Sequence, residues 1–284
     1  MSDDLSSGKG HRDENFPVAS RLLPRRYRSH LLAIYGFARL ADTIGDESEG
    51  SRLAELDWLE AELERAAAGT ATNPLLRRLT PTIDAFGMDL APFRALISAN
   101  RIDQRRRRYA TFEELAGYCE LSAVPVGRLV LATFGASTPA RVALSDRVCT
   151  ALQVVEHLQD VGEDARQGRV YLPADDLREF GVTDADLLAP KASPALRRLV
   201  AFEATRARGL LASGRPLVAD LRGWCRVAVA GYVAGGAAAV DAISRADHDV
   251  LGHRCSPRRR DVLTQSLQLV FGRPRGPLGS AVGA

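Results

Sequence analysis

Apolar residues recur every three or four positions along most of this chain, and this spacing constrains the fold more than any other feature. It is seen in Leu31, Ile34, Tyr35, Ala38 and Ala41, and again in Leu53, Leu56, Leu59 and Leu63. Side chains so spaced lie along one face of an α-helix, whereas strand-like alternation is rare here. Breaks rich in Gly and Pro divide the chain into roughly eight or more segments of this kind. The sequence therefore predicts an all-α fold.

The chain is long enough to bury one large hydrophobic core. It has 284 residues, of which 46% are hydrophobic, and a chain of this length forms one large domain or two. We expect a single helical domain over residues 13–271. Residues 1–12 and 272–284 are rich in Gly, Pro and Ser, so we expect mobile segments at both termini.

Charge and cysteine content exclude several classes of protein. The net charge of +3 is a mild basic excess and does not resemble that of a nucleic-acid-binding protein. The 4 cysteines are widely scattered with no Cys-x-x-Cys pair, which argues against a zinc site and favours a reducing compartment. The first dozen residues contain no apolar core and do not form a signal peptide. We therefore expect a cytoplasmic location.

Three segments carry specific local predictions. Pro125 lies inside the helical pattern of residues 115–134 and predicts a kink there. Residues 168–173 read Gly-Arg-Val-Tyr-Leu-Pro, which predicts an extended connection because a proline disfavours a helical residue before it. The apolar stretch 227–240 falls short of the ~20 residues that cross a bilayer. Its small residues instead predict close packing of one helix against another.

Two acidic clusters carry the strongest indication of function. Asp42 and Asp46 form one pair and Asp160 and Asp164 the other, each pair spaced i, i+4 in a helical context. Carboxylates so spaced project from one face of an α-helix. Two such faces opposed across a helical bundle would offer the hard oxygen ligands that suit Mg²⁺, which usually bridges protein carboxylates to substrate phosphates.

The residues beside the pairs favour phosphate chemistry over a solvated helix face. Arg39 lies three positions before Asp42 and can bind a phosphate. Taken by itself, this arginine would also fit an ordinary surface ion pair with Asp42. Glu156 extends the second pair, Asp160 and Asp164, into a ladder of carboxylates inside an otherwise apolar segment. Like charges so spaced repel unless cations neutralise them. We interpret the two clusters together as a metal–phosphate site.

Several stretches of the chain resemble squalene/phytoene synthases. They read Glu14-Asn-Phe-Pro-Val-Ala-Ser-Arg-Leu-Leu-Pro24, Ala33-Ile-Tyr-Gly-Phe-Ala-Arg-Leu-Ala-Asp42, Tyr118-Cys-Glu-Leu-Ser-Ala-Val-Pro-Val-Gly127 and Gln159-Asp-Val-Gly-Glu-Asp164. The resemblance spans nearly the whole chain. Within that family, the first stretch, the Ala-Asn-Arg-Ile-Asp-Gln run at 99–104 and the segment 168–173 are most similar to hydroxysqualene synthases of bacterial hopanoid biosynthesis.

The resemblance implies a single-domain isoprenoid synthase helical bundle with a central apolar cavity. It further implies a substrate diphosphate held by a trinuclear Mg²⁺ cluster, no requirement for NADPH, and conversion of presqualene diphosphate and water to hydroxysqualene and diphosphate. The resemblance assigns metal binding to Asp42, Asp46, Asp160 and Asp164, diphosphate contacts to Arg39 and Arg254, and the lining of the reaction centre to Tyr118, Gln153 and Tyr232.

The chain departs from the family pattern at a few positions, which leaves alternatives open. Glu156 and Gln159, both expected near the substrate, stand where many head-to-head synthases carry asparagine and arginine. This difference disfavours the condensation of two allylic diphosphates. A histidine of the family falls at Arg12, with His11 adjacent, and neither is assigned a role. The alternative enzyme is a head-to-head prenyl transferase that makes presqualene diphosphate, dehydrosqualene or phytoene. The alternative of another class is a non-catalytic prenyl-diphosphate binding or assembly protein, against which the intact carboxylate ladders argue.

A basic run of Arg105, Arg106, Arg107 and Arg108 remains outside these assignments. A nucleic-acid site would need a broader basic surface with stacking aromatic residues, and only Tyr109 follows the run. We interpret it as a solvated helix end near the active site. Attraction to anionic lipid, with peripheral contact at the inner face of the membrane, is the alternative. The sequence predicts no oligomeric state.

Overall fold

The computed structural model describes residues 23–48 and 50–271, and within them it contains helices and no β-strand. One isolated bridge pairs Arg108 with Val170. In chain order the helices are α1 (Arg25–Glu47), α2 (Arg52–Ala67), α3 (Pro74–Phe86), α4 (Ala91–Asp103), α5 (Phe112–Ser122), α6 (Val124–Thr133), α7 (Pro139–Gln159), α8 (Val161–Arg166), α9 (Ala174–Phe180), α10 (Asp184–Leu187), α11 (Pro194–Gly214), α12 (Pro216–Asp220), α13 (Gly223–Arg245) and α14 (Arg259–Phe271). The predicted all-α fold is confirmed.

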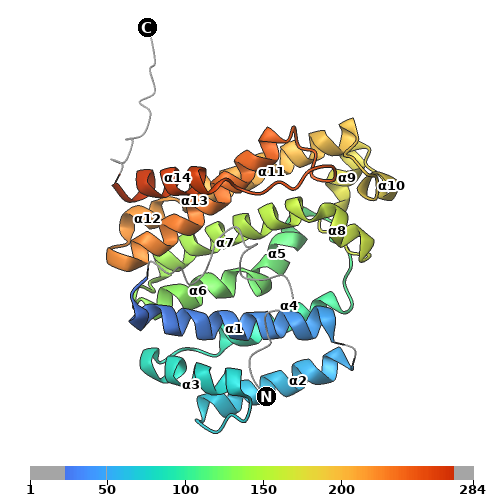
Figure 1. The fold of residues 1–284 in the computed structure, drawn as a ribbon. Coiled ribbons are helices and arrows are strands. Elements are labelled where there is room, and N and C mark those ends of the chain that lie inside the picture. Colours follow the sequence, from blue (N-terminus) through green and yellow to red (C-terminus); the bar gives the residue numbers. More distant parts are fainter. Residues whose placement is uncertain (1–22, 49, 272–284) are drawn as a thin grey trace.

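The helices stack in layers around two main hydrophobic clusters. In Figure 1, α2 and α3 lie at one side, followed by α1 and α4, then α5, α6 and α7, and finally α11, α13 and α14. One cluster joins α1 to α4, and the larger one extends from α4 to α13. The C-terminal ends of α1 and α7 lie at the same end of the bundle, beside α8 (Figure 1). This arrangement brings the two aspartate pairs to one region of the molecule.

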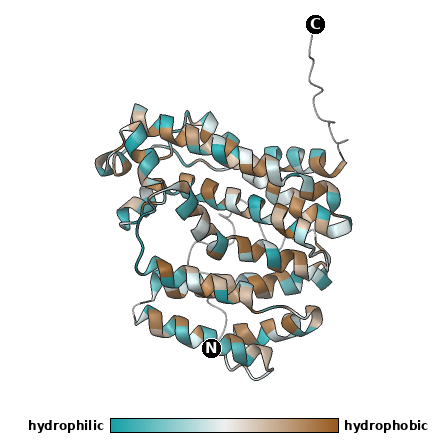
Figure 2. Ribbon diagram, turned by 180° about the vertical axis from the view of Figure 1, so that it is seen from behind, coloured by the Kyte–Doolittle hydropathy of each residue, from teal (hydrophilic) through white to brown (hydrophobic). Residues whose placement is uncertain are grey.

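Local sequence signals set several helix ends. Asn73 caps α3 by accepting hydrogen bonds from the backbone N–H groups of the second and third helical residues, while Pro74 occupies the first position. Gly87 ends the same helix in the left-handed conformation, with φ of 55°. Each helix carries both hydrophobic and hydrophilic residues (Figure 2), as expected when one face packs inward and the other meets solvent.

The small residues of α13 allow the close packing predicted from the stretch 227–240. A Cβ atom added to Gly236 would overlap the side chain of Leu152 on α7, so no larger residue fits there without movement. By length and composition, residues 112–133, which span α5 and α6, and α13 would each suffice to cross a membrane. Of the apolar window in each segment, 44% and 61% respectively is buried inside the molecule.

The local predictions can be compared with the structure. The helical pattern of residues 115–134 breaks at Ala123, between α5 and α6 and just before Pro125, so the predicted kink is confirmed. Residues 168–173 form the expected extended connection, in which the Val170 N–H donates to the carbonyl of Arg107 at 2.9 Å. The basic run 105–108 is exposed but follows the end of α4 instead of forming part of it. The predicted segments 1–12 and 272–284, and with them His11 and Arg12, lie outside the described residues.

Candidate active site

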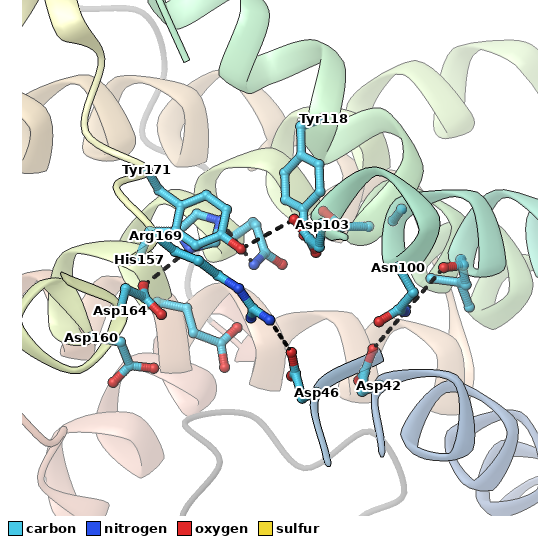
Figure 3. Close-up of a pocket in the computed structure, with 15 residues that line it drawn as sticks. Asp42, Asp46, Asn100, Asp103, Tyr118, His157, Asp160, Asp164, Arg169 and Tyr171 are labelled. Carbon is cyan, nitrogen blue, oxygen red and sulfur yellow. Dashed lines mark hydrogen bonds and ion pairs between the residues drawn. The ribbon is translucent and has the colours of Figure 1, made fainter. Parts of the chain in front are cut away.

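Both aspartate pairs line one cavity of about 240 Å³, which we call the aspartate cavity. Asp42 and Asp46 come from the C-terminal half of α1, Asp160 lies at the junction of α7 and α8, and Asp164 lies on α8. Figure 3 shows the two pairs on different walls, with the side chain of Arg169 reaching between them. The full lining is Asp42, Asp46, Leu96, Ala99, Asn100, Asp103, Tyr118, Ser122, Gln153, Glu156, His157, Asp160, Asp164, Arg169 and Tyr171.

The second pair spans a helix break that periodicity does not reveal. Helix α7 ends at Gln159, and Asp160 has φ of −102° and ψ of 9° before α8 begins. The backbone N–H of Asp164 nevertheless donates to the carbonyl of Asp160 at 2.8 Å, which preserves the i, i+4 relation across the break. The helical context of the second pair is thus divided between two helices. The prediction that both carboxylates face one side is confirmed, because both line the cavity.

Asn100 on α4 supports the first pair. Its Nδ2 donates to Asp42 Oδ1 at 3.2 Å and to the carbonyl of Leu96 at 3.2 Å. Desolvation raises the pKa of Asp42 to about 6, while the bond from Asn100 and the charge of Arg39 act in the opposite direction. The Asp42 residue is nevertheless exposed and lines the cavity, which limits the desolvation. A Cβ atom at Gly45 would overlap the Asn100 side chain, which explains a glycine between the two aspartates.

Arg169 is a cavity residue to which the sequence analysis assigned no role. It belongs to the extended connection 168–173, which begins at Gly168 with φ of 75°. Its Nη2 lies 2.6 Å from Asp46 Oδ1, and its side chain is only 10% exposed. Desolvation lowers the pKa of Arg169, but the bond to Asp46 raises it by more, so the guanidinium stays cationic. Its segment was part of the family resemblance, but only the tertiary fold places it opposite α1.

A group of buried polar rings forms another wall of the cavity. The hydroxyl of Tyr118, one of the predicted site residues, donates to Asp103 Oδ2 at 2.6 Å. Asp103 itself was not among the residues predicted from the sequence. The rings of Tyr171 and His157 stack with centroids 3.7 Å apart. Burial lowers the pKa of His157 to about 3, so the imidazole is neutral. The amide Nε2 of Gln153 lies 3.2 Å from the ring Nε2 of His157. Because an amide nitrogen can only donate, the ring Nε2 accepts and the ring proton is assigned to Nδ1.

A second, more apolar cavity of about 250 Å³ adjoins the first and collects other predicted residues. Arg39 from α1 and Tyr232 from α13 line it, while Asp42, Ser122, Gln153 and Glu156 line both cavities. The apolar part of its wall comprises Ile34, Ala38, Ala123, Val126, Val130 and Leu152. The structure therefore joins a charged chamber to an apolar one, and the prediction of a cavity inside the helical bundle is confirmed.

Two of the predicted site residues, Gln159 and Arg254, line neither the aspartate cavity nor the more apolar cavity beside it. The Gln159 Nε2 group donates to the carbonyl of Cys255, which ties α7 to the loop before α14. Arg254, in that same loop, lines a separate depression of about 550 Å³ together with Arg197, His253 and Arg258. The role of Arg254 in binding the diphosphate therefore stays a prediction.

The donor set of the aspartate cavity fits magnesium bound together with a phosphate. The lining includes the carboxyl groups of Asp42, Asp46, Asp103, Glu156, Asp160 and Asp164 and a single guanidinium, that of Arg169. Such an excess of negative charge favours cations. Within residues 23–48 and 50–271, no three His, Cys, Asp or Glu side chains come close enough to hold a metal ion by themselves. Mg²⁺ completes its octahedron with water and substrate phosphate oxygens, so these carboxylates would hold it only together with a phosphate.

Comparison with known proteins defines the class. Residues 10–261 match the family model for squalene/phytoene synthase, and the chain belongs to this family. It is an isoprenoid-synthase enzyme of the all-helical fold shared by squalene and dehydrosqualene synthases.

Among individual relatives, hydroxysqualene synthases match over most of the chain. The identity is 43% to that of Rhodopseudomonas palustris, over 77% of this chain and 75% of the relative. It is 39% to that of Zymomonas mobilis, over 73% and 70%. The crystal structure of squalene synthase HpnC from Alicyclobacillus acidocaldarius superposes with a TM-score of 0.77 at 44% identity, covering 81% of this chain and 88% of that one. A dehydrosqualene synthase structure superposes with a TM-score of 0.78 at 26% identity, over 87% of both chains.

Proposed function

We propose that this enzyme is a hydroxysqualene synthase that ionises presqualene diphosphate and adds water to the carbocation, giving hydroxysqualene and diphosphate. The observation that carries the proposal is the junction of two unlike chambers: five aspartates, among them both pairs, line one, and mainly apolar side chains line the other. A prenyl diphosphate has a charged head and a long apolar tail, and the two chambers match these two parts. The similarity to hydroxysqualene synthases selects this member of the family.

The residues that would hold magnesium are Asp42, Asp46, Asp160 and Asp164. When bound, the metal ions supply Lewis-acid stabilisation of the departing diphosphate. Arg169 reaches across the cavity to Asp46 and provides a fixed positive charge that needs no reorganisation when the C–O bond breaks. The apolar wall of the second cavity excludes bulk water from the cation, while Gln153 and Glu156 stand at the boundary between the chambers.

A head-to-head prenyl transferase is the second candidate function. It is favoured by 37% identity to a phytoene synthase of Arthrospira platensis over 69% of this chain. Glu156 and Gln159 weigh against it, because Gln159 is engaged with the loop of Cys255 and carries no positive charge toward a second diphosphate.

One assay separates these functions. The purified protein is incubated with Mg²⁺ and either presqualene diphosphate or farnesyl diphosphate, without NADPH, and the lipid products are identified. Hydroxysqualene from presqualene diphosphate supports the proposal. Consumption of farnesyl diphosphate alone supports the transferase, and consumption of neither supports a non-catalytic binding protein.

We propose in addition that the enzyme works in the cytoplasm and contacts the inner face of the membrane peripherally, since its product is a membrane lipid. The exposed run 105–108 supplies basic charge for such contact. Two of its members are already paired in the structure, Arg106 with Glu114 and Arg108 with Asp184, so the expected attraction is weak. Flotation with vesicles containing anionic lipid at low salt tests this, and absence of binding contradicts it.

A further inference from the structure

Asp103 is a buried carboxyl group that lines the aspartate cavity but belongs to neither aspartate pair. It is the last residue of α4 and is 7% exposed. Two phenols donate to it: Tyr118 Oη to Oδ2 at 2.6 Å, and Tyr171 Oη to Oδ1 at 3.4 Å. Burial raises the pKa of Asp103 to about 6, and the bond from Tyr118 opposes this rise. Because a buried carboxyl group is costly unless its oxygens are hydrogen-bonded, both phenols are committed to it as donors.

Neighbouring rings hold these two phenols in place. The Tyr109 ring packs against those of Tyr118 and Tyr171 at centroid distances of 5.4 and 5.8 Å, and His157 stacks on Tyr171. A phenol has one proton, and its oxygen can also accept hydrogen bonds. Since the Tyr118 proton points at Asp103, the Tyr118 oxygen is available to the cavity only as an acceptor.

Ser122 provides an independent observation at the same place. It lies four residues after Tyr118 on α5, so the two side chains project from one side of the helix. Ser122 lines both the aspartate cavity and the apolar cavity, and its buried Oγ has no hydrogen-bond partner among the described residues. A buried hydroxyl without a partner points to an ordered water or a ligand. The Tyr118 oxygen and the Ser122 hydroxyl together supply two of the polar partners that a bound water needs.

We propose that Asp103 is a positioning residue that fixes the Tyr118 hydroxyl as an acceptor and so, with Ser122, orients the water that captures the carbocation. This inference rests on the proposed function, because it concerns the step that forms the alcohol.

Written as a balanced step, a lone pair of the water oxygen forms the new C–O bond. The proton that this oxygen then loses passes to Tyr118 Oη, while the Tyr118 proton moves to Asp103 Oδ2. The product is a neutral alcohol, and Asp103 returns its proton to solvent before the next turnover. No oxidant, reductant or further reactant is required.

The test compares Asp103→Asn and Ser122→Ala with the control Tyr109→Phe. The Tyr109 ring lies in the same ring cluster, but Tyr109 lines neither cavity, so its loss removes a phenol without touching the proposed water site. Each variant receives presqualene diphosphate and Mg²⁺, and two quantities are measured: the rate of diphosphate release, which follows ionisation, and the fraction of product that is hydroxysqualene. Melting temperatures establish that each variant is folded.

We expect Asp103→Asn to lower the hydroxysqualene fraction about tenfold or more, with hydrocarbons formed by proton loss or isomeric alcohols in its place, as expected for loss of a charged hydrogen bond. Diphosphate release should fall much less. Ser122→Ala should shift the product in the same direction, and it carries the test alone if Asp103→Asn does not fold. An unchanged product fraction in both variants, or a fall in diphosphate release as large as the fall in alcohol, overturns the inference. If the unaltered enzyme makes no hydroxysqualene from presqualene diphosphate, the proposed function fails first, and the two failures are thus distinguishable.

Discussion

The first prediction concerns Glu62, a fully buried carboxylate on α2 that supports the part of the fold carrying Asp42 and Asp46. Its exposed fraction is 0%. Oε2 accepts from the backbone N–H groups of Thr72 and Asn73 at 3.0 and 2.9 Å, and Oε1 accepts from Thr72 Oγ1 and Arg65 Nε, both at 2.7 Å. These bonds join α2 to the connection that enters α3. The carboxylate thus organises a helix junction within the hydrophobic cluster that also contains α1.

The magnitude follows from the pKa of Glu62. Burial disfavours its ionised form, but the hydrogen bonds outweigh burial and lower the pKa from 4.5 to about 2. At about 1.4 kcal/mol per pH unit, this difference contributes roughly 3 kcal/mol to the free energy of unfolding. Because the folded-state pKa is depressed, the contribution is fully present above pH 4.5 and is lost as the pH falls toward 2. Glu62→Gln removes the charge and turns an amide N–H₂ toward groups that are themselves donors.

The assay is urea unfolding of the wild type and of Glu62→Gln between pH 7 and pH 3. We expect the variant to be less stable by roughly 3 kcal/mol at neutral pH, and the difference to shrink by about 1.4 kcal/mol per pH unit below the unfolded-state pKa. Glu64→Gln on the same helix is the matched control, because Glu64 and its partner Arg94 have side chains 49% and 43% exposed. Exposed pairs of this kind contribute less than about 1 kcal/mol. A difference between wild type and Glu62→Gln that is small, or independent of pH, would refute the reasoning.

Three further predictions concern the site and the packing around it. Asp160→Asn should lower turnover by several orders of magnitude while the circular dichroism spectrum and melting temperature stay close to wild type; an unchanged rate would contradict the metal assignment. Gly236→Ala should destabilise the protein by about 1–3 kcal/mol in thermal unfolding, because its Cβ would overlap Leu152, whereas Gly231→Ala on the same helix meets no atom within 4 Å and should cost nothing. Arg169→Gln removes the only arginine of residues 23–48 and 50–271 that lines the aspartate cavity and should slow diphosphate release about tenfold or more in single-turnover assays; an equal rate would show that its charge serves only the fold.

Much of the fold could be predicted because it depends on local periodicity. Apolar spacing identified the helices, and the small residues of 227–240 identified the helix that packs closely against α7. The break at Asp160 escaped prediction because a hydrogen bond from the Asp164 N–H to the Asp160 carbonyl preserves the helical spacing of the two aspartates across it. The contact of Arg254 with the diphosphate stays a prediction, since a loop residue has no helical period that fixes the side on which it lies.

The candidate site, like the fold, could be predicted from the sequence only in part. The i, i+4 spacing alone identified Asp42 with Asp46 and Asp160 with Asp164, because helix geometry makes each pair a neighbour before any tertiary contact forms. Their convergence in one cavity agrees with that prediction, whereas their role as metal ligands stays a prediction.

What the sequence by itself determined about this protein is therefore the set of helices and the carboxylates that each helix presents on one face. Only the tertiary structure decided that Arg169 meets Asp46 and that Asp103 holds the Tyr118 proton. The physical reason is that these contacts join residues of different elements, and their distances depend on how whole helices pack. Spacing along one helix sets which groups share a face, but only packing sets which groups stand opposite them.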